Sequence, residues 1–125
     1  LAHSGIKTLP ASVGQLARLK KLDLRACALL RTLPDLSGLA SLEILDLAYL
    51  GITRIPDSIK RLARLEKLIL LGCAQLAQLP DVFANLTALR ILNLTDSGIT
   101  ELPPSLGQLA ALTVLGLRPA RARRV

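Results

Sequence analysis

Few side chains in this 125-residue sequence are of a type that performs chemistry. Asp23 and Asp46 hold equivalent positions in two similar segments, which predicts carboxylates about 5 Å apart on neighbouring strands. Carboxylates at that separation can act as general acid and base. Because Lys21 and Arg25 stand beside them on a surface expected to be open and solvated, we predict an ion-pair cluster and not a catalytic pair.

The two thiols are predicted to have a structural role, and the single imidazole, that of His3, is predicted to lie on the surface. Cys27 and Cys73 follow equivalent segments two repeats apart, which predicts about 10 Å between their Cα atoms. A disulfide needs less than about 7 Å, so we expect two buried, reduced thiols. His3 has no second nitrogen or sulfur ligand nearby in the sequence, and no base can be paired with a buried thiol. We therefore predict that these residues form no enzyme, bind no cofactor and hold no metal.

A repeated motif supplies the elements that position these residues. The unit L-x-x-L-x-L occurs five times, and its copies start 23 or 24 residues apart, at Leu19, Leu42, Leu65, Leu89 and Leu112. Its alternating apolar residues predict a short strand in each copy. An apolar residue and a proline follow each of the first four copies, from Leu33-Pro34 to Leu102-Pro103. Proline has no N–H to donate, so it suits the segment that leaves a sheet.

This pattern resembles the leucine-rich repeat family, in the short plant-type form with a Leu-Pro signature. The resemblance implies an α/β fold: a curved leucine-rich repeat solenoid with a parallel β-sheet on its concave face and irregular or short helical turns on its convex face. The segments that include Cys27 and Cys73 look like those of plant intracellular immune receptors and of bacterial type III effectors of the ubiquitin-ligase kind. In such effectors the repeats choose the target, and a separate domain carries the ligase activity. No ligase motif occurs in this sequence.

Leucine columns predict the core. The fourth position of the motif gives one ladder, made of Leu22, Leu45, Leu68, Leu92 and Leu115. The sixth position gives a second ladder, made of Leu24, Leu47, Leu70, Leu94 and Leu117, which Leu1 also fits. Two departures from the repeat are a Pro34-Asp-Leu36 turn one residue shorter than its siblings and Leu50 where Asn or Cys is usual. We expect residues 1–117 to form one repeat domain of about five repeats, truncated at the N-terminus and uncapped, and residues 118–125 to form an arginine-rich tail or linker.

The charge balance limits the classes of partner. The net charge is +7, but residues 1–117 carry 12 basic and 9 acidic groups, because four arginines lie in the last eight residues. Tyr49 and Phe83 are the only aromatic residues, and single-strand nucleic-acid sites usually combine a basic stripe with stacking aromatics. We expect no specific nucleic-acid partner. The alternative is weak, nonspecific binding of anions such as nucleic acid through the arginine-rich tail. No apolar stretch is long enough to cross a bilayer, so we expect no membrane partner.

Side chains between the repeated leucines should face outward on the concave sheet. They predict an apolar patch of aliphatic residues with an aromatic residue at its edge and basic residues around it. The predicted partner-binding residues are Ile44, Tyr49, Ile69, Leu71, Ile91, Lys21, Arg25 and Lys67. Apolar patches bordered by charge mark protein interfaces. Two alternatives stay open: β-branched residues chosen for strand propensity alone, and a further segment of the same chain folded over the patch.

These observations predict a monomeric module that binds a partner protein on its concave sheet. A protein of a host organism is one such partner. We expect it to be the target-recognition part of a bacterial virulence effector. The alternatives are a structural or autoinhibitory segment packed on another domain, or the repeat domain of a plant-type immune receptor. The sequence has no cysteine cluster of the kind that caps secreted relatives, which favours an intracellular protein. Delivery by bacteria into the host cytoplasm is consistent with that location.

Overall fold

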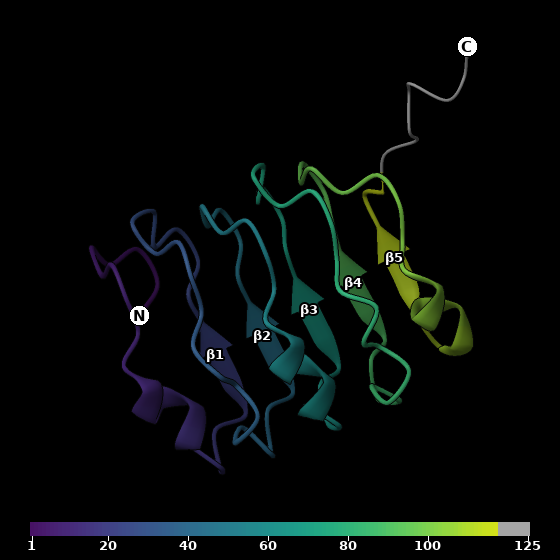
Figure 1. The fold of residues 1–125 in the computed structure, drawn as a ribbon, viewed down its shortest axis with the longest axis horizontal. Coiled ribbons are helices and arrows are strands. Elements are labelled where there is room, and N and C mark those ends of the chain that lie inside the picture. Colours follow the sequence, from purple (N-terminus) through teal and green to yellow (C-terminus); the bar gives the residue numbers. More distant parts are fainter. Residues whose placement is uncertain (118–125) are drawn as a thin grey trace.

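We describe the protein from a computed structural model over residues 1–117, so the predicted arginine-rich tail lies outside the described residues. A five-stranded parallel sheet forms one side of the structure, and its strands follow sequence order (Figure 1). The strands are β1 (Lys21–Asp23), β2 (Ile44–Asp46), β3 (Lys67–Ile69), β4 (Ile91–Asn93) and β5 (Thr113–Leu115). Each L-x-x-L-x-L copy supplies one strand, so every turn of the chain advances the solenoid by one strand.

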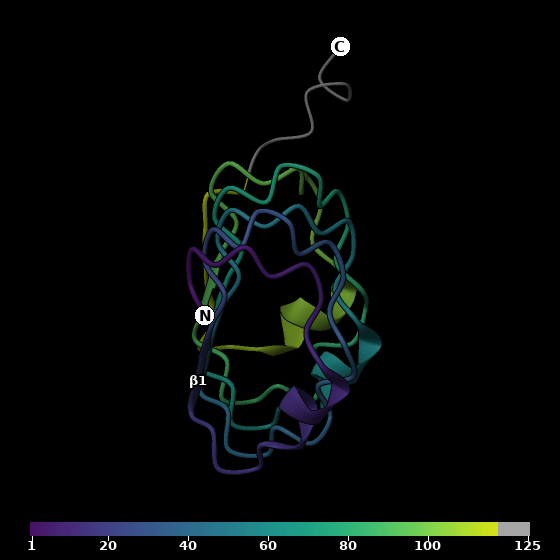
Figure 2. The ribbon, with the colours of Figure 1, turned by 90° about the vertical axis from the view of Figure 1, so that its left-hand side faces the viewer.

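The return segments lie on the side opposite the sheet (Figure 2). Three of them contain a short 3-10 helix: η1 (Ala11–Gln15), η2 (Asp57–Arg61) and η3 (Pro104–Gln108). Each helix follows a proline whose backbone is extended, in keeping with the fixed φ of that residue. The segments after Pro34 and Pro80 have no helix. Helical and irregular turns therefore alternate along the convex side.

Serine side chains join each irregular turn to the helical turn that follows it. The Leu36 N–H donates to Ser58 Oγ at 2.9 Å, and the Phe83 N–H donates to Ser105 Oγ at 3.0 Å. The Ser105 N–H in turn donates to Asp81 Oδ1 at 2.9 Å. A buried backbone N–H without a partner is costly. Ser58 and Ser105 thus each satisfy an N–H donor that the preceding irregular turn leaves unpaired.

The predicted leucine ladders form the core of the central repeats. Leu45, Leu68 and Leu92 stack from strand to strand and are fully buried. Full burial of one such side chain contributes about 1.5 to 3 kcal/mol, and the neighbouring repeats provide the surface that covers it. Leu50, where Asn or Cys is usual, is also buried at 2 % exposure. This departure from the repeat adds one more apolar side chain to the core.

The two thiols are free and buried, as predicted. Each donates a hydrogen bond to a carbonyl of the preceding repeat, Cys27 Sγ to Leu1 O at 2.9 Å and Cys73 Sγ to Leu47 O at 3.0 Å. Burial raises the pKa of the Cys73 thiol, which keeps the thiol protonated and able to donate. The cysteines thus connect successive repeats through their side chains.

The last repeat corrects the predicted core. Val114, not Leu115, pairs with Leu92, so Thr113 lies beside Ile91. Leu115 and Leu117 are 44 % and 38 % exposed instead of buried. A shift of one residue moves every side chain of a strand to the other face, and no strand follows β5 within the described residues to fix its register.

Gly116 accompanies the shifted register. Its φ is +77°, and a Cβ there would lie 2.5 Å from the backbone of Thr95. At the other end, Leu1 is 62 % exposed. Its carbonyl nevertheless accepts from Cys27 Sγ, as the carbonyl of Leu47 in the same ladder accepts from Cys73 Sγ. The prediction that Leu1, Leu115 and Leu117 are buried is therefore wrong in residues 1–117.

The buried thiols predict a reactivity that depends on folding. Iodoacetamide should not modify Cys27 or Cys73 in buffer near neutral pH, because alkylation needs an accessible thiolate. Both residues should react after unfolding in urea, with mass spectrometry of the intact chain as the measurement. Rapid modification of two thiols in the folded chain would contradict this placement.

The serine contacts predict a difference between two equivalent positions. Ser105→Ala should lower the free energy of unfolding by about 1 to 3 kcal/mol, because the Phe83 N–H loses its partner in a buried site. Ser12→Ala is the matched control, since Ser12 holds the same position in η1 but is exposed. That change should stay within about 0.5 kcal/mol. Urea unfolding followed by circular dichroism measures both, and equal losses would refute the role of the Ser105 hydroxyl.

Candidate functional site: the concave sheet

The register of the sheet fixes which side chains share the concave face. One outward column contains Lys21, Ile44, Lys67, Ile91 and Thr113, and the next contains Asp23, Asp46, Ile69, Asn93 and Leu115. A third column just beyond the strands contains Arg25, Ala48, Leu71 and Thr95. Val114 and Gly116 were predicted in the first two columns, and the shift of β5 replaces them with Thr113 and Leu115. Arg118, predicted in the third column, lies outside the described residues.

The aliphatic members of these columns alternate with polar ones. Lys67 lies between Ile44 and Ile91, and Ile69 lies between Asp46 and Asn93. Ile69 and Leu71 follow each other on the same face of one repeat, about 7 Å apart along the strand direction. All four aliphatic side chains are half-buried. The sheet thus brings the predicted aliphatic residues onto one face, in a chequered arrangement with polar neighbours.

Tyr49 lies at the edge of this face on the loop after β2. Its side chain is 56 % exposed, and its N–H donates to Leu71 O at 2.7 Å. Its ring lies against Gly72, where a Cβ would overlap the aromatic carbons. Gly72 has a φ of +72°, so a glycine suits the position both in conformation and in space. The ring therefore lies over the backbone of Gly72, the residue that follows Leu71.

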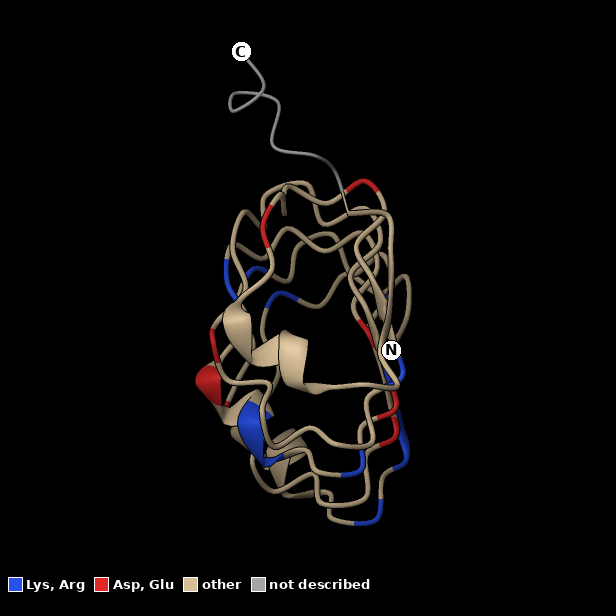
Figure 3. Cartoon of the chain, turned by 90° about the vertical axis from the view of Figure 1, so that its right-hand side faces the viewer, with Lys and Arg blue, Asp and Glu red and all other residues tan. Residues whose placement is uncertain are grey.

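Charged residues of both signs are interspersed over the sheet side and the opposite side (Figure 3).

Among residues 1–117 no group of three or more His, Cys, Asp or Glu side chains is arranged to hold a metal ion. No helix in the same part of the chain is long and apolar enough to cross a membrane.

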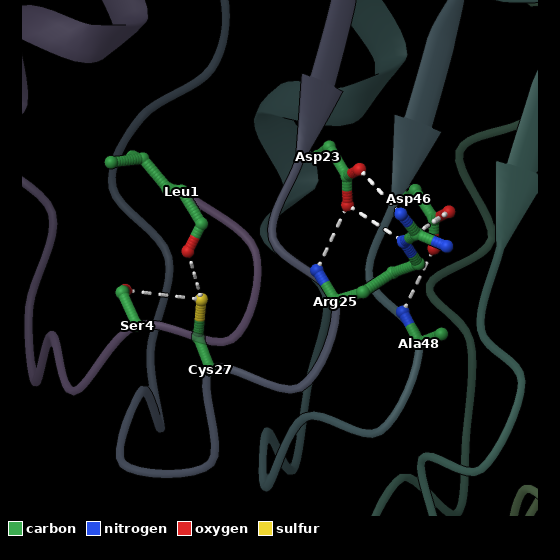
Figure 4. A network of polar contacts seen from close by, with 7 residues as sticks. All are labelled: Leu1, Ser4, Asp23, Arg25, Cys27, Asp46 and Ala48. Atoms are coloured by element: carbon green, nitrogen blue, oxygen red, sulfur yellow. Dashed lines mark hydrogen bonds and ion pairs between the residues drawn. The ribbon is translucent and has the colours of Figure 1, made fainter.

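Arg25 pairs with both carboxylates that the sequence singled out (Figure 4). Its Nε lies 3.0 Å from Asp23 Oδ1, and its Nη2 donates to Asp23 Oδ2 at 3.0 Å. The same Nε lies 3.5 Å from Asp46 Oδ2. The hydrogen bond from Arg25 lowers the pKa of the Asp23 carboxyl below its ordinary value. A carboxylate held ionised in this way has no proton to donate, so the pair is built as an ion-pair cluster.

A second role of this column went unnoticed in the sequence. Asp23, Asp46 and Asn93 each accept, through Oδ1, a hydrogen bond of 3.0 to 3.2 Å from the backbone N–H two residues later. The signal was present, since Asp and Asn commonly bond the backbone two residues on. Ile69 occupies this column in β3 and has no such oxygen. Within the described residues, the Leu71 N–H therefore has no hydrogen-bond partner.

A hollow lies beside the aliphatic residues at the start of strands β3 to β5. It has a volume of about 520 Å³ and is lined by Glu66, Lys67, Arg90, Ile91, Ala111 and Thr113. Lys67 was predicted to border the binding surface. Sequence reasoning missed the hollow itself, because its far wall depends on the register of β5.

Comparisons with known proteins agree with this architecture. A model of the Leucine Rich Repeat family matches residues 88–109, while no curated protein matches the chain. A leucine-rich repeat protein of Leptospira interrogans has a similar structure, with a TM-score of 0.82 and 33 % identity over 90 % of this chain. A plant peptide hormone receptor, solved in complex with its peptide, gives a TM-score of 0.75 and 26 % identity over 90 % of this chain. The chain spans 29 % and 19 % of these two proteins.

The leucine-rich repeat domain of the type III effector XopL is also similar. It gives a TM-score of 0.53 and 26 % identity over 94 % of this chain and 58 % of that domain's chain. The leucine-rich repeat fold generally mediates protein–protein interaction. The repeated motif, the parallel sheet with its leucine ladders and these matches together identify the chain as a leucine-rich repeat protein.

Proposed function

We propose that this repeat domain binds a partner protein on its concave face and performs no chemistry itself. The observation that carries the proposal is the set of four aliphatic side chains, Ile44, Ile69, Leu71 and Ile91, which the sheet holds outward and half-exposed. Such residues gain free energy when a partner covers them. The nearby charged groups then restrict which partner fits.

The proposal extends to the biological setting. We assign the domain the target-recognition role of a bacterial effector, acting as a monomer in the cytoplasm of a host cell. The likeness to the XopL repeat domain supports this assignment, together with the plant-type repeats that contain Cys27 and Cys73. A receptor role is the second candidate, and the similarity to a plant receptor that binds a peptide hormone favours it.

The test replaces two neighbouring aliphatic residues on the concave face. The chain with Ile69→Glu and Leu71→Glu should lose its partner from plant cell extract, measured by quantitative mass spectrometry of the captured proteins. Two carboxylates at these positions would be buried without a counter-ion in the complex, which costs far more than the lost apolar contact. Circular dichroism should show that the variant still folds, because both positions face outward.

A matched control carries the same change elsewhere. Leu16 and Leu29 are 49 % and 48 % exposed, more than the half-buried Ile69 and Leu71, and lie outside the concave columns. The chain with Leu16→Glu and Leu29→Glu should retain the partner. Loss of the partner in both variants, or in neither, would show that the concave aliphatic residues are not the recognition surface. The autoinhibitory alternative predicts instead that the unmodified chain captures another domain of its own protein.

A further inference from the structure

The basic residues of the concave face fall into two groups with different availability. Both ion pairs within 4.0 Å in residues 1–117 belong to Arg25, which Asp23 and Asp46 engage. Lys67 and Arg90 are exposed and make no ion pair in the same part of the chain. Their charges are therefore available to a ligand, whereas that of Arg25 is already neutralised.

These two available cations meet at the hollow at the start of strands β3 to β5. Lys67 and Arg90 line it together with one carboxylate, that of Glu66, so basic charge exceeds acidic charge there. Thr113 contributes a hydroxyl, and Ile91 and Ala111 contribute apolar surface. The space of about 520 Å³ is larger than one acidic side chain requires. The hollow therefore has room for an acidic side chain together with the backbone that carries it.

Beyond Lys67 in the direction of strand β3, the concave surface offers aliphatic side chains and amide N–H donors. Ile69 and Leu71 follow Lys67 at intervals of two residues along the same face. The Leu71 N–H has no partner in the described residues, because Ile69 takes the place of an Asp or Asn. Asn93 uses its Oδ1 to accept from Thr95, which leaves its amide N–H groups to donate. Donors beside an aliphatic strip suit the carbonyl groups of an extended peptide.

We propose that the concave face takes an extended peptide segment of its partner, with an acidic side chain in the Lys67 and Arg90 hollow and an aliphatic side chain two residues away on Ile69 and Leu71. Residues two apart in an extended chain are separated by about 7 Å, which matches the step from Lys67 to Ile69. This inference rests on the proposed function, since it names the chemistry of the partner for the same face.

The test selects ligands without assuming a partner. Phage-displayed random heptapeptides are panned on the 125-residue chain, and the enriched sequences are read. They should contain Asp or Glu with Leu, Ile or Val two positions away. A synthetic enriched peptide should bind at least about tenfold more weakly when its Asp is changed to Asn, because the amide loses the charge that strengthens hydrogen bonds from Lys67 and Arg90.

Variants of the protein separate the hollow from general electrostatics. The chain with Lys67→Glu and Arg90→Glu should select peptides with Lys or Arg in place of the acidic residue, and Lys67→Gln with Arg90→Gln should abolish the acidic preference. The matched control, Arg18→Glu with Arg64→Glu, makes the same charge change at two exposed residues outside the concave columns and should leave the acidic preference intact. A control that loses the preference as fully as the hollow variants would overturn the inference.

Two further outcomes distinguish this inference from the proposed function. Peptides that require Ile69 and Leu71 but show no acidic preference would overturn the acidic-peptide inference and leave concave binding in place. Enriched peptides that bind the Ile69→Glu and Leu71→Glu variant as well as the unmodified chain would overturn both. A single-stranded oligonucleotide that displaces the peptide at equal concentration would show a general anion site and would also overturn the inference.

Discussion

Burial of leucine between adjacent repeats is the interaction on which the rest of this structure depends. A three-residue strand with one inward side chain has little surface of its own to bury, so each repeat needs a neighbour on both sides. In the central repeats this requirement is met, and Leu45, Leu68 and Leu92 are fully buried. The structure describes no further repeat beside the first and last ones in residues 1–117, and Leu1 and Leu115 are exposed. Stability therefore comes from the stack of repeats.

The same stacking determines where function is located. Because the inward positions are filled by leucine, the outward positions of each strand are free to vary, and five strands place them side by side. Cys27 and Cys73 are used inside the stack, and Asp23 and Asp46 are held by Arg25. The chemically capable residues thus serve structure. What remains for a partner is a surface of aliphatic, amide and basic groups.

The repeat made most of the fold predictable, and the exceptions have local physical causes. Five copies of one motif predict the strands, their order and the reduced thiols, because each inference is checked several times along the chain. The register of β5 was mispredicted because β4 alone pairs with it among the described strands. Contacts between turns, such as that of Ser58 with Leu36, were also not foreseen. These contacts join residues of different repeats, and no regularly spaced residue pattern in the sequence marks them.

The sequence by itself determined the repeat, the solenoid, the buried ladders of the central repeats and the set of side chains on the concave face, because strand periodicity alone assigns a face to each residue. Tertiary structure decided how those side chains combine. In residues 1–117 it committed Arg25 to two carboxylates, gave Lys67 and Arg90 no ion pair beside a hollow, and gave the Leu71 N–H no hydrogen-bond partner. Those outcomes depend on distances between neighbouring repeats, which spacing along one chain does not specify.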